Sequence, residues 1–243
     1  VGKVNQSAKL TETFTKQLED NPSYLAGFGE GDHVEYREGI FVGYRYYDKK
    51  KMDVLFPFGY GLSYTTFAYS NLCLDKKTMK DTEELTVSVD VTNTGDRTGK
   101  EVVQLYVADK ESTVIRPVKE LRDFVKIELA PGETKTVTFT LGKRAFAYYD
   151  VQIHDWQVET GEFEILIGAS SRDIALRDTV TVESTVKIPF HYTTDTTMGD
   201  IMSRPEAWKL VQSVLSKGMF GQGSEVNEGG DAAKEAISDE MNA

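Results

Sequence analysis

Cysteine and histidine are scarce in this sequence, and their scarcity argues against two kinds of site. The 243 residues include one cysteine, so no disulfide can form within the chain. A chain without disulfides suits a reducing compartment, which favours the cytoplasm. The three histidines, His33, His154 and His191, are too far apart for metal-ligand spacing. We therefore expect surface or structural roles for them, and we expect no metal ion and no other cofactor.

Basic residues and long apolar runs are also lacking. The 28 Lys and Arg residues stand against 39 Asp and Glu residues, which gives a net charge of −11. This charge repels phosphates and argues against a nucleic-acid partner. Near the end of the chain a group of acidic residues faces only Lys234, which is typical of a solvated tail. The group comprises Glu225, Glu228, Asp231, Glu235, Asp239 and Glu240. We find no apolar run long enough to span a membrane.

The single cysteine, Cys73, lies in the run Asn71–Leu74, which is typical of a strand. Free cysteine is often buried, where it behaves as a small hydrophobic residue. We therefore predict a buried packing role for Cys73 and not a reactive thiol.

A period of two in hydrophobicity begins at Phe67 and predicts strands. From Leu85 to Val91 apolar and polar residues alternate, as in a strand that has one buried and one wet face. The same alternation returns at 103–107, 137–141, 163–167 and 180–182. About seven closely spaced strands with no strong helix between them predict an antiparallel β-sandwich over residues 67–187. Tyr106 and Trp156 are predicted as rings of its core.

An aromatic segment precedes the strands and separates two regions of different character. Residues 38–67 contain nine aromatic residues and four glycines in thirty positions. So many rings need a surface on which to pack, which a flexible linker does not provide. We interpret residues 38–66 as a fixed joint between two domains. Its glycines are expected to supply backbone angles that other residues disfavour.

Charged residues in and beyond the joint have structural and catalytic interpretations. Glu38 and Asp48 bracket the joint, and Arg45 lies between them. We predict a buried Arg–carboxylate pair that holds the joint, because buried charges are usually retained through pairing, and we prefer this to a catalytic pair. The run Lys119–Arg122 is predicted to be a solvated edge that discourages pairing between sheets.

Helices are expected only towards the two ends. Thr11–Leu18 is predicted as a short helix that Asn21–Pro22 ends. Near the other end, Ser203 is predicted to cap a helix that has Pro205 in its first turn and that Gly218 ends. Its apolar stripe consists of Ala207, Leu210, Val211, Val214 and Leu215. Residues 221–230 are expected to form a linker, and 231–241 a further short helix.

Two motifs of the joint, Glu38–Asp48 and Phe56–Phe67, carry a family resemblance. They resemble the end of the α/β sandwich domain of glycoside hydrolase family 3, the β-glucosidases, which a fibronectin type III-like domain follows. Four other runs match as well: Lys9–Phe14, Leu18–Tyr24, Val118–Arg122 and Leu129–Glu133. The resemblance covers about Val1 to Lys187 and continues more weakly into the tail.

The resemblance implies a mainly β chain with three parts. Residues 1–66 would be the C-terminal remnant of an α/β sandwich domain together with the aromatic joint. Residues 67–187 would form a fibronectin type III-like antiparallel β-sandwich, and residues 188–243 a helical, acidic tail. Since Val1 begins inside a family motif, we expect the natural chain to continue before it.

The family's activity implies chemistry that these residues do not carry. Retaining hydrolysis of terminal β-D-glucosides requires a nucleophilic carboxylate and an acid/base carboxylate. In the family these lie in an N-terminal barrel domain and earlier in the α/β sandwich, and neither surrounding motif occurs here. We therefore assign no catalytic residue and no metal site, and we leave the substrate-binding residues unassigned. The expected partners are the barrel and α/β sandwich domains of the parent enzyme, through which the chain would meet β-glucosides.

Two non-catalytic alternatives remain open at this point. Exposed aromatic residues such as Tyr148, Tyr149 and Trp156 would suit a carbohydrate-binding module, since sugars stack on flat rings. The amphipathic tail helix, or a bare face of the sandwich, would suit an oligomerisation module. Neither alternative requires catalysis by this chain.

Overall fold

The structure is a computed structural model that describes residues 4–25, 32–186, 190 and 192–220. The chain divides into two compact units, Val1–Lys187 and Ile188–Ala243. The finer boundaries that we predict from the sequence, with a division after residue 66, stay predictions.

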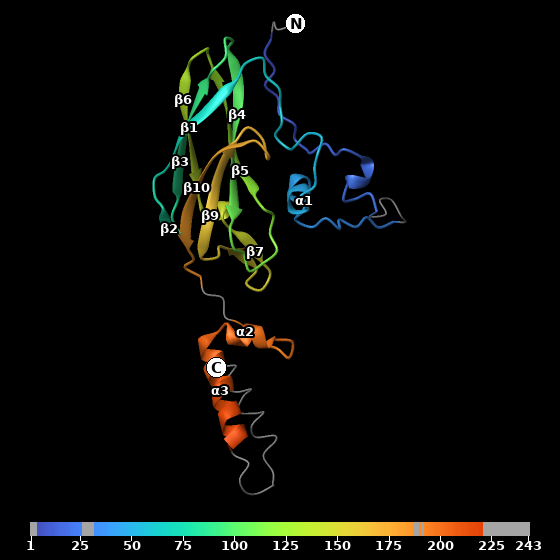
Figure 1. Cartoon of the computed structure of the whole chain (residues 1–243), viewed down its shortest axis with the longest axis vertical. Coiled ribbons are helices and arrows are strands. Elements are labelled where there is room, and N and C mark those ends of the chain that lie inside the picture. Colours follow the sequence, from blue (N-terminus) through green and yellow to red (C-terminus); the bar gives the residue numbers. More distant parts are fainter. Residues whose placement is uncertain (1–3, 26–31, 187–189, 191, 221–243) are drawn as a thin grey trace. The chain divides into compact units, whose positions relative to one another are not determined.

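The first unit contains two sheets that pack face to face (Figure 1). The smaller sheet has the order β1 (Phe67–Leu74), β3 (Leu85–Asn93), β6 (Thr134–Leu141). The larger has the order β2 (Thr78–Lys80), β10 (Ile174–Glu183), β9 (Gly161–Gly168), β4 (Gly99–Asp109), β5 (Glu120–Leu129). A separate hairpin pairs β7 (Tyr148–Asp150) with β8 (Asp155–Gln157). The predicted β-sandwich is confirmed.

The core between the sheets consists of the inward side chains of alternating strands. Along β3, Leu85, Val87, Val89 and Val91 are fully buried, and the polar residues between them are only partly covered. Val103 and Leu105 of β4 face them from the larger sheet and belong to the same cluster. Alternation of this kind produces one buried face per strand.

The strand count and one pairing differ from the prediction. The described residues contain ten strands and not about seven, because three of them are only three residues long and show no readable alternation. Short β2 pairs with β10 in parallel, and the other strand pairs are antiparallel. The short connection from β1 to β2 places β2 beside β10 and transfers the chain from one sheet to the other.

The predicted helix at Thr11–Leu18 is wrong. The described structure there is extended around Phe14 and contains only a one-turn 3-10 helix, η1 (Leu18–Asp20). Phe14 N donates to Phe56 O at 2.9 Å, and Leu55 N donates to Phe14 O at 2.8 Å. Thr11, Thr13 and Thr15 alternate with other residues, and this β-branched pattern favours extended backbone over a helix.

The described part of the second unit consists of two helices, α2 (Met198–Met202) and α3 (Pro205–Phe220). Pro205 is the first residue of α3, as predicted. The prediction that Ser203 caps the start of this helix is wrong, because Ser203 is the C-terminal cap of α2. The N-terminal cap of α2 is Thr197. Gly218 does not end α3, which continues to Phe220. Residues 221–230 and 231–241 lie outside the described residues. No described helix is both long and apolar enough to cross a membrane.

The predicted burial of Cys73 is wrong, since its side chain is exposed. Pairing between β1 and β3 shifts register between Ser70 and Cys73, where Asn71 has a φ of 53°. After this bulge Leu72 and Leu74 pack on the core, so Cys73 points to the opposite face.

Because Cys73 is exposed, we expect it to react with a thiol reagent in the folded protein. A chromogenic disulfide reagent without denaturant should modify one thiol per chain, and guanidinium should release no second thiol. Modification that occurs only after unfolding would contradict the exposed position. Cys73→Ser supplies the blank for this titration.

Candidate functional site

The most extensive polar and aromatic arrangement lies on the outer face of the larger sheet. On β4, Gln104 and Tyr106 point away from the sandwich core, yet both are buried. The joint covers them. Tyr44 of α1 (Tyr44–Lys49) stacks on Phe58 with ring centroids 4.8 Å apart and meets the Tyr106 ring edge-on at 6.0 Å. Tyr106 is thus buried as predicted, but in a second cluster outside the sandwich core.

Hydrogen bonds link this ring cluster to the sheet. Leu121 N donates to Tyr44 Oη at 2.7 Å, and Tyr106 Oη donates to Gln104 Oε1 at 2.6 Å. Gln104 Nε2 in turn donates to Gly59 O at 3.1 Å and Ala169 O at 2.7 Å. Burial raises the pKa of Tyr44 and of Tyr106 above the ordinary value. Both phenols therefore stay neutral donors or acceptors in this interface.

Gly59 permits a close approach between the joint and the larger sheet. Its φ is 81°, and a Cβ atom at this position would overlap Gln104 Oε1. Phe58 O, one residue earlier, accepts a hydrogen bond from Ser171 N at 2.9 Å. Only glycine satisfies both the backbone angle and the contact. Gly39 and Gly43 also have positive φ, as expected for the joint. The expectation is wrong for Gly61, whose φ is not positive and where a Cβ would instead overlap Ala8 O.

Charged groups surround the rings, but their pairing differs from the prediction. Arg45 pairs with Glu120 of β5 at 3.4 Å, so the predicted pairs with Glu38 and Asp48 are wrong. Asp48 pairs instead with Lys119 at 2.6 Å and Arg172 at 3.1 Å. The sequence therefore places the right residue types in the joint, and the sandwich supplies their partners.

The run Lys119–Arg122 is not the solvated edge that we predict from sequence. The side chains of Lys119, Glu120 and Arg122 are only 12%, 16% and 18% exposed. Glu120 also accepts from Arg122 at 2.6 Å. Burial lowers the pKa of the Arg122 guanidinium, and the Glu120 carboxylate opposes this shift. The run forms the socket that receives α1.

The extended N-terminal segment attaches to the same sheet at a second place. Lys9 pairs with the nearly buried carboxylate of Glu101 at 2.9 Å, and Tyr69 Oη donates to the same carboxylate at 3.2 Å. Burial raises the pKa of Tyr69. Leu10 N donates to Tyr60 O at 2.8 Å, so this segment and the joint hold each other.

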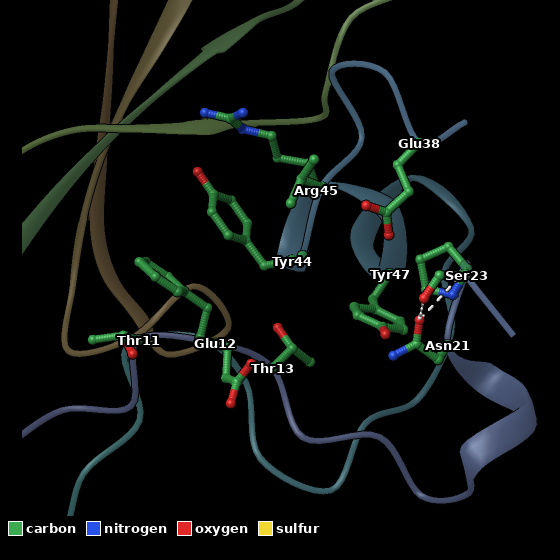
Figure 2. A pocket seen from close by; sticks show the side chains of 13 residues that line it. Thr11, Glu12, Thr13, Asn21, Ser23, Glu38, Tyr44, Arg45 and Tyr47 are labelled. Carbon is green, nitrogen blue, oxygen red and sulfur yellow. Dashed lines mark hydrogen bonds between the residues drawn. The ribbon is translucent and has the colours of Figure 1, made fainter. Parts of the chain in front are cut away.

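A groove of about 370 Å³ lies between the N-terminal segment and α1 (Figure 2). Its lining consists of Thr11, Glu12, Thr13, Asn21, Pro22, Ser23, Glu38, Val42, Gly43, Tyr44, Arg45, Tyr47 and Phe58. Its carboxylates belong to Glu12 and Glu38, which lie apart, with Thr13 between them in the view of Figure 2. Burial, followed by the charge of Glu38, raises the pKa of Tyr47. This geometry gives no facing pair of carboxylates for glycoside hydrolysis.

Two of the three aromatic residues considered for carbohydrate binding, Tyr148 and Trp156, have a cation over the ring, and Tyr149 remains about half exposed. The Arg144 guanidinium lies 3.3 Å from the Trp156 ring centroid, and the rest of Trp156 packs on the core. Tyr149 meets Trp156 edge-on at 5.6 Å, and Arg116 lies over the Tyr148 ring at 5.7 Å. Sugar stacking needs an open flat face, which Trp156 and Tyr148 do not offer.

Two of the three histidines lie in the part of the chain that the structure describes. His33 and His154 are exposed, and His191 lies outside the described residues. Among the residues that the structure describes, no three His, Cys, Asp or Glu side chains are placed to bind one metal ion.

Large exposed hydrophobic side chains concentrate in the part of the chain before the sandwich. Thirteen of those described lie within the first 66 residues, against seven in the longer stretch 67–187. The thirteen are Val4, Phe14, Leu18, Tyr24, Leu25, Val34, Tyr36, Ile40, Val42, Leu55, Phe56, Leu62 and Tyr64. Such density is typical of a surface that another protein part covers.

Comparison with known proteins identifies the domain type and relatives. The family model of the fibronectin type III-like domain matches residues 101–171. Thermostable beta-glucosidase B of Acetivibrio thermocellus is 57% identical over 216 residues, which are 89% of this chain and 29% of that protein. An exo-alpha-(1->6)-L-arabinopyranosidase of Bifidobacterium breve is 44% identical over 221 residues, which are 91% of this chain and 29% of that protein.

Solved structures agree with these relatives. A GH3 beta-glucosidase of Bifidobacterium adolescentis superposes with a TM-score of 0.76 at 42% identity, over 86% of this chain and 31% of that one. A beta-glucosidase of Kluyveromyces marxianus in complex with glucose gives a TM-score of 0.69 at 45% identity, over 75% of this chain and 22% of that one. The chain spans less than a third of the length of each of these proteins.

Gly59→Ala is expected to destabilise the protein by at least about 2 kcal/mol, because it adds backbone strain and breaks a buried hydrogen-bond network. Denaturant unfolding measures the change. Gly132→Ala should cost only about 1 kcal/mol, since its φ is 74° but the space around it is open. Gly142→Ala, with open space and no positive φ, should be nearly neutral. Equal costs at positions 59 and 132 would contradict the contact with Gln104.

Asp48→Ala is expected to cost about 3 kcal/mol, because it leaves two largely covered cations without their carboxylate. Denaturant unfolding gives the free energy, and faster proteolysis within the joint would locate the damage. Asp53→Ala removes the exposed partner of Lys16 and serves as the matched control, for which we expect no measurable change. Similar behaviour of the two variants would show that the socket does not hold the joint.

Proposed function

Because this chain is the C-terminal portion of a glycoside hydrolase family 3 enzyme, we propose that it supports the catalytic part of a β-glucosidase. In this proposal residues 1–66 complete an α/β sandwich domain and end in the joint. Residues 67–187 are the fibronectin type III-like domain, and residues 188–243 form a helical tail. The parent enzyme would hydrolyse terminal β-D-glucosides.

The observation that carries the proposal is the contrast between the covered and the exposed residues of the segment before the sandwich. Towards the sandwich, its rings, hydrogen bonds and ion pairs are nearly all covered. Elsewhere, the residues before the sandwich expose a dense set of large hydrophobic side chains. A segment that is fixed to one domain and still exposes many large hydrophobic side chains is suited to hold a further domain in place.

We assign cleavage of the glycosidic bond to the rest of the parent enzyme. Retaining hydrolysis needs two carboxylates about 5–5.5 Å apart, and the described residues of this chain offer no such pair around the groove. Two relatives named for different activities, a beta-glucosidase and an arabinopyranosidase, each match most of this chain. Their difference supports the proposal that the choice of sugar also lies outside it.

A chimera tests the proposal directly. This chain would replace the matching portion of thermostable beta-glucosidase B of Acetivibrio thermocellus, with which it shares 57% identity. We expect the chimera to hydrolyse an aryl β-glucoside, while the isolated 243-residue chain does not, because support and catalysis are then separate. The same enzyme cut before the replaced portion is the control and should be inactive or unstable.

Two outcomes would overturn the proposal. Turnover by the isolated chain that disappears when one of its own carboxylates is removed would place catalysis here. Full activity and unchanged thermal stability of the shortened enzyme would show that this portion supports nothing.

A further inference from the structure

The loop between β4 and β5, residues 110–119, has its charged and apolar side chains in inverted positions. Arg116 and Pro117 are buried, whereas Ile115 is 76% exposed. Val114 and Val118 are exposed on either side, at 37% and 48%. A solvated loop would normally turn its arginine outward and cover its isoleucine. The inversion indicates that the loop presents an apolar tip.

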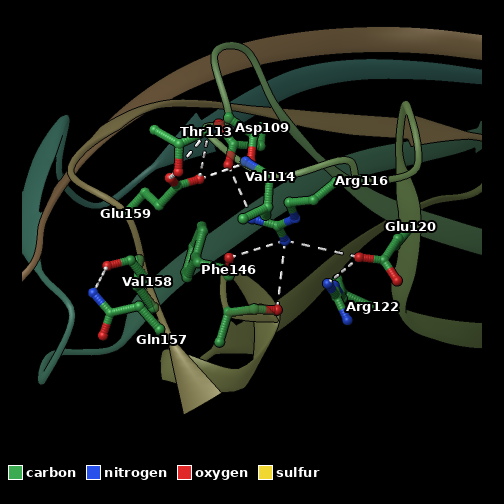
Figure 3. Close-up of polar contacts among 12 residues, drawn as sticks. Asp109, Thr113, Val114, Arg116, Glu120, Arg122, Phe146, Gln157, Val158 and Glu159 are labelled. Atoms are coloured by element: carbon green, nitrogen blue, oxygen red, sulfur yellow. Dashed lines mark hydrogen bonds and ion pairs between the residues drawn. The ribbon is translucent and has the colours of Figure 1, made fainter. Parts of the chain in front are cut away.

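Arg116 anchors the base of this loop (Figure 3). Its guanidinium pairs with Asp109 at 2.9 Å and approaches Glu120 at 3.8 Å. It also donates to Phe146 O at 3.1 Å, a backbone group near the β7–β8 hairpin. A buried arginine with this many acceptors is compensated and geometrically fixed, because each partner restricts the planar fork.

Glu159 fixes the other side of the loop (Figure 3). Its carboxylate accepts from Ser112 Oγ at 2.7 Å and from Thr113 N at 3.1 Å, and it also bonds the Thr113 hydroxyl. Ser112 and Thr113, the two residues directly before Val114, are therefore held by the side chain of Glu159, which precedes β9. Little conformational entropy remains for Val114 and Ile115 to lose on binding.

The loop also continues the surface of the joint. Lys49 of α1 donates to Arg116 O at 3.0 Å, and Lys119 at the end of the loop pairs with Asp48 of α1. The apolar tip is thus fixed to the same segment that, in the proposed function, completes the α/β sandwich domain. Its position and its rigidity favour a binding partner in the portion of the enzyme that joins this segment.

We propose that Val114, Ile115 and Val118 bind an apolar surface on the portion of the family 3 hydrolase that this chain does not contain. This inference rests on the proposed function and names a second contact, separate from the joint. Less than a third of each relative is represented here, so the remaining portion is large enough to supply the surface. A sugar fits less well, since branched aliphatic side chains offer neither a flat face nor hydrogen bonds.

Cysteine labelling in the chimera tests this contact. In a Cys73→Ser background, Ile115→Cys would be labelled with a maleimide in the isolated chain and in the chimera. Burying a side chain of this size is favourable enough to keep the contact closed most of the time. We therefore expect the labelling rate in the chimera to be at least about tenfold lower than in the isolated chain. Val151→Cys, at a similarly exposed position in the β7–β8 turn, is the matched control and should react at the same rate in the isolated chain and in the chimera.

Each outcome decides the question. Equal labelling of Ile115→Cys in an active chimera would overturn the inference and leave the proposed function standing. Slow labelling in the isolated chain as well would also overturn it, because the tip would then be covered by the chain itself.

Thermal inactivation provides a second readout. We expect Ile115→Asp to raise the rate at which the chimera loses activity on heating about tenfold, while the unfolding midpoint of the isolated chain stays unchanged. An inactive chimera would instead contradict the proposed function.

Discussion

The structure depends on the burial of β4 on both of its faces. One face, with Val103 and Leu105, closes the sandwich core, as in any two-sheet fold. The other face carries Gln104 and Tyr106, whose polar atoms would need water if nothing covered them. The joint supplies the missing cover and the missing partners, through the Tyr44 ring and Gly59 O. The domain and the joint are therefore one packed body, and neither is complete without the other.

The ion pairs around this interface contribute mainly to geometry. Pairs such as Asp48 with Lys119 lie at the edge of the ring cluster, where they are largely but not wholly removed from water. Desolvation offsets much of the attraction between such charges, so their net contribution to stability is modest. A wrong docking angle would leave them unpaired at considerable cost. The rings thus provide most of the stabilisation, and the charges restrict α1 to one position on the socket.

The sequence predicts the sandwich well, because a period of two and turn residues are local signals. The concentration of rings in residues 38–67 predicted a fixed joint, whereas Tyr106 was correctly predicted as buried but placed in the wrong cluster. The socket was not, since Lys119–Arg122 reads as a charged edge until the partners from the joint, more than seventy positions earlier, are known. One signal for it exists: Gln104 is a polar residue within the otherwise apolar run Val102–Val107. The predicted burial of Cys73 was wrong for a related reason, because a β-bulge changes the face of the sheet on which the following residues lie.

A domain with the proposed supporting role must hold a neighbouring domain in a fixed orientation, which requires a joint that is rigid. A flexible linker of similar length would let two domains rotate independently. Here Gly59, Phe58 and Leu10, in the joint and the segment before it, are each held by hydrogen bonds of their backbone groups. In the proposed arrangement the apolar tip of the β4–β5 loop would add a second contact beside the joint, because Lys49 and Asp48 of α1 fix this loop to the joint. Two contacts held on one rigid body restrict the orientation of a bound domain more tightly than one contact does.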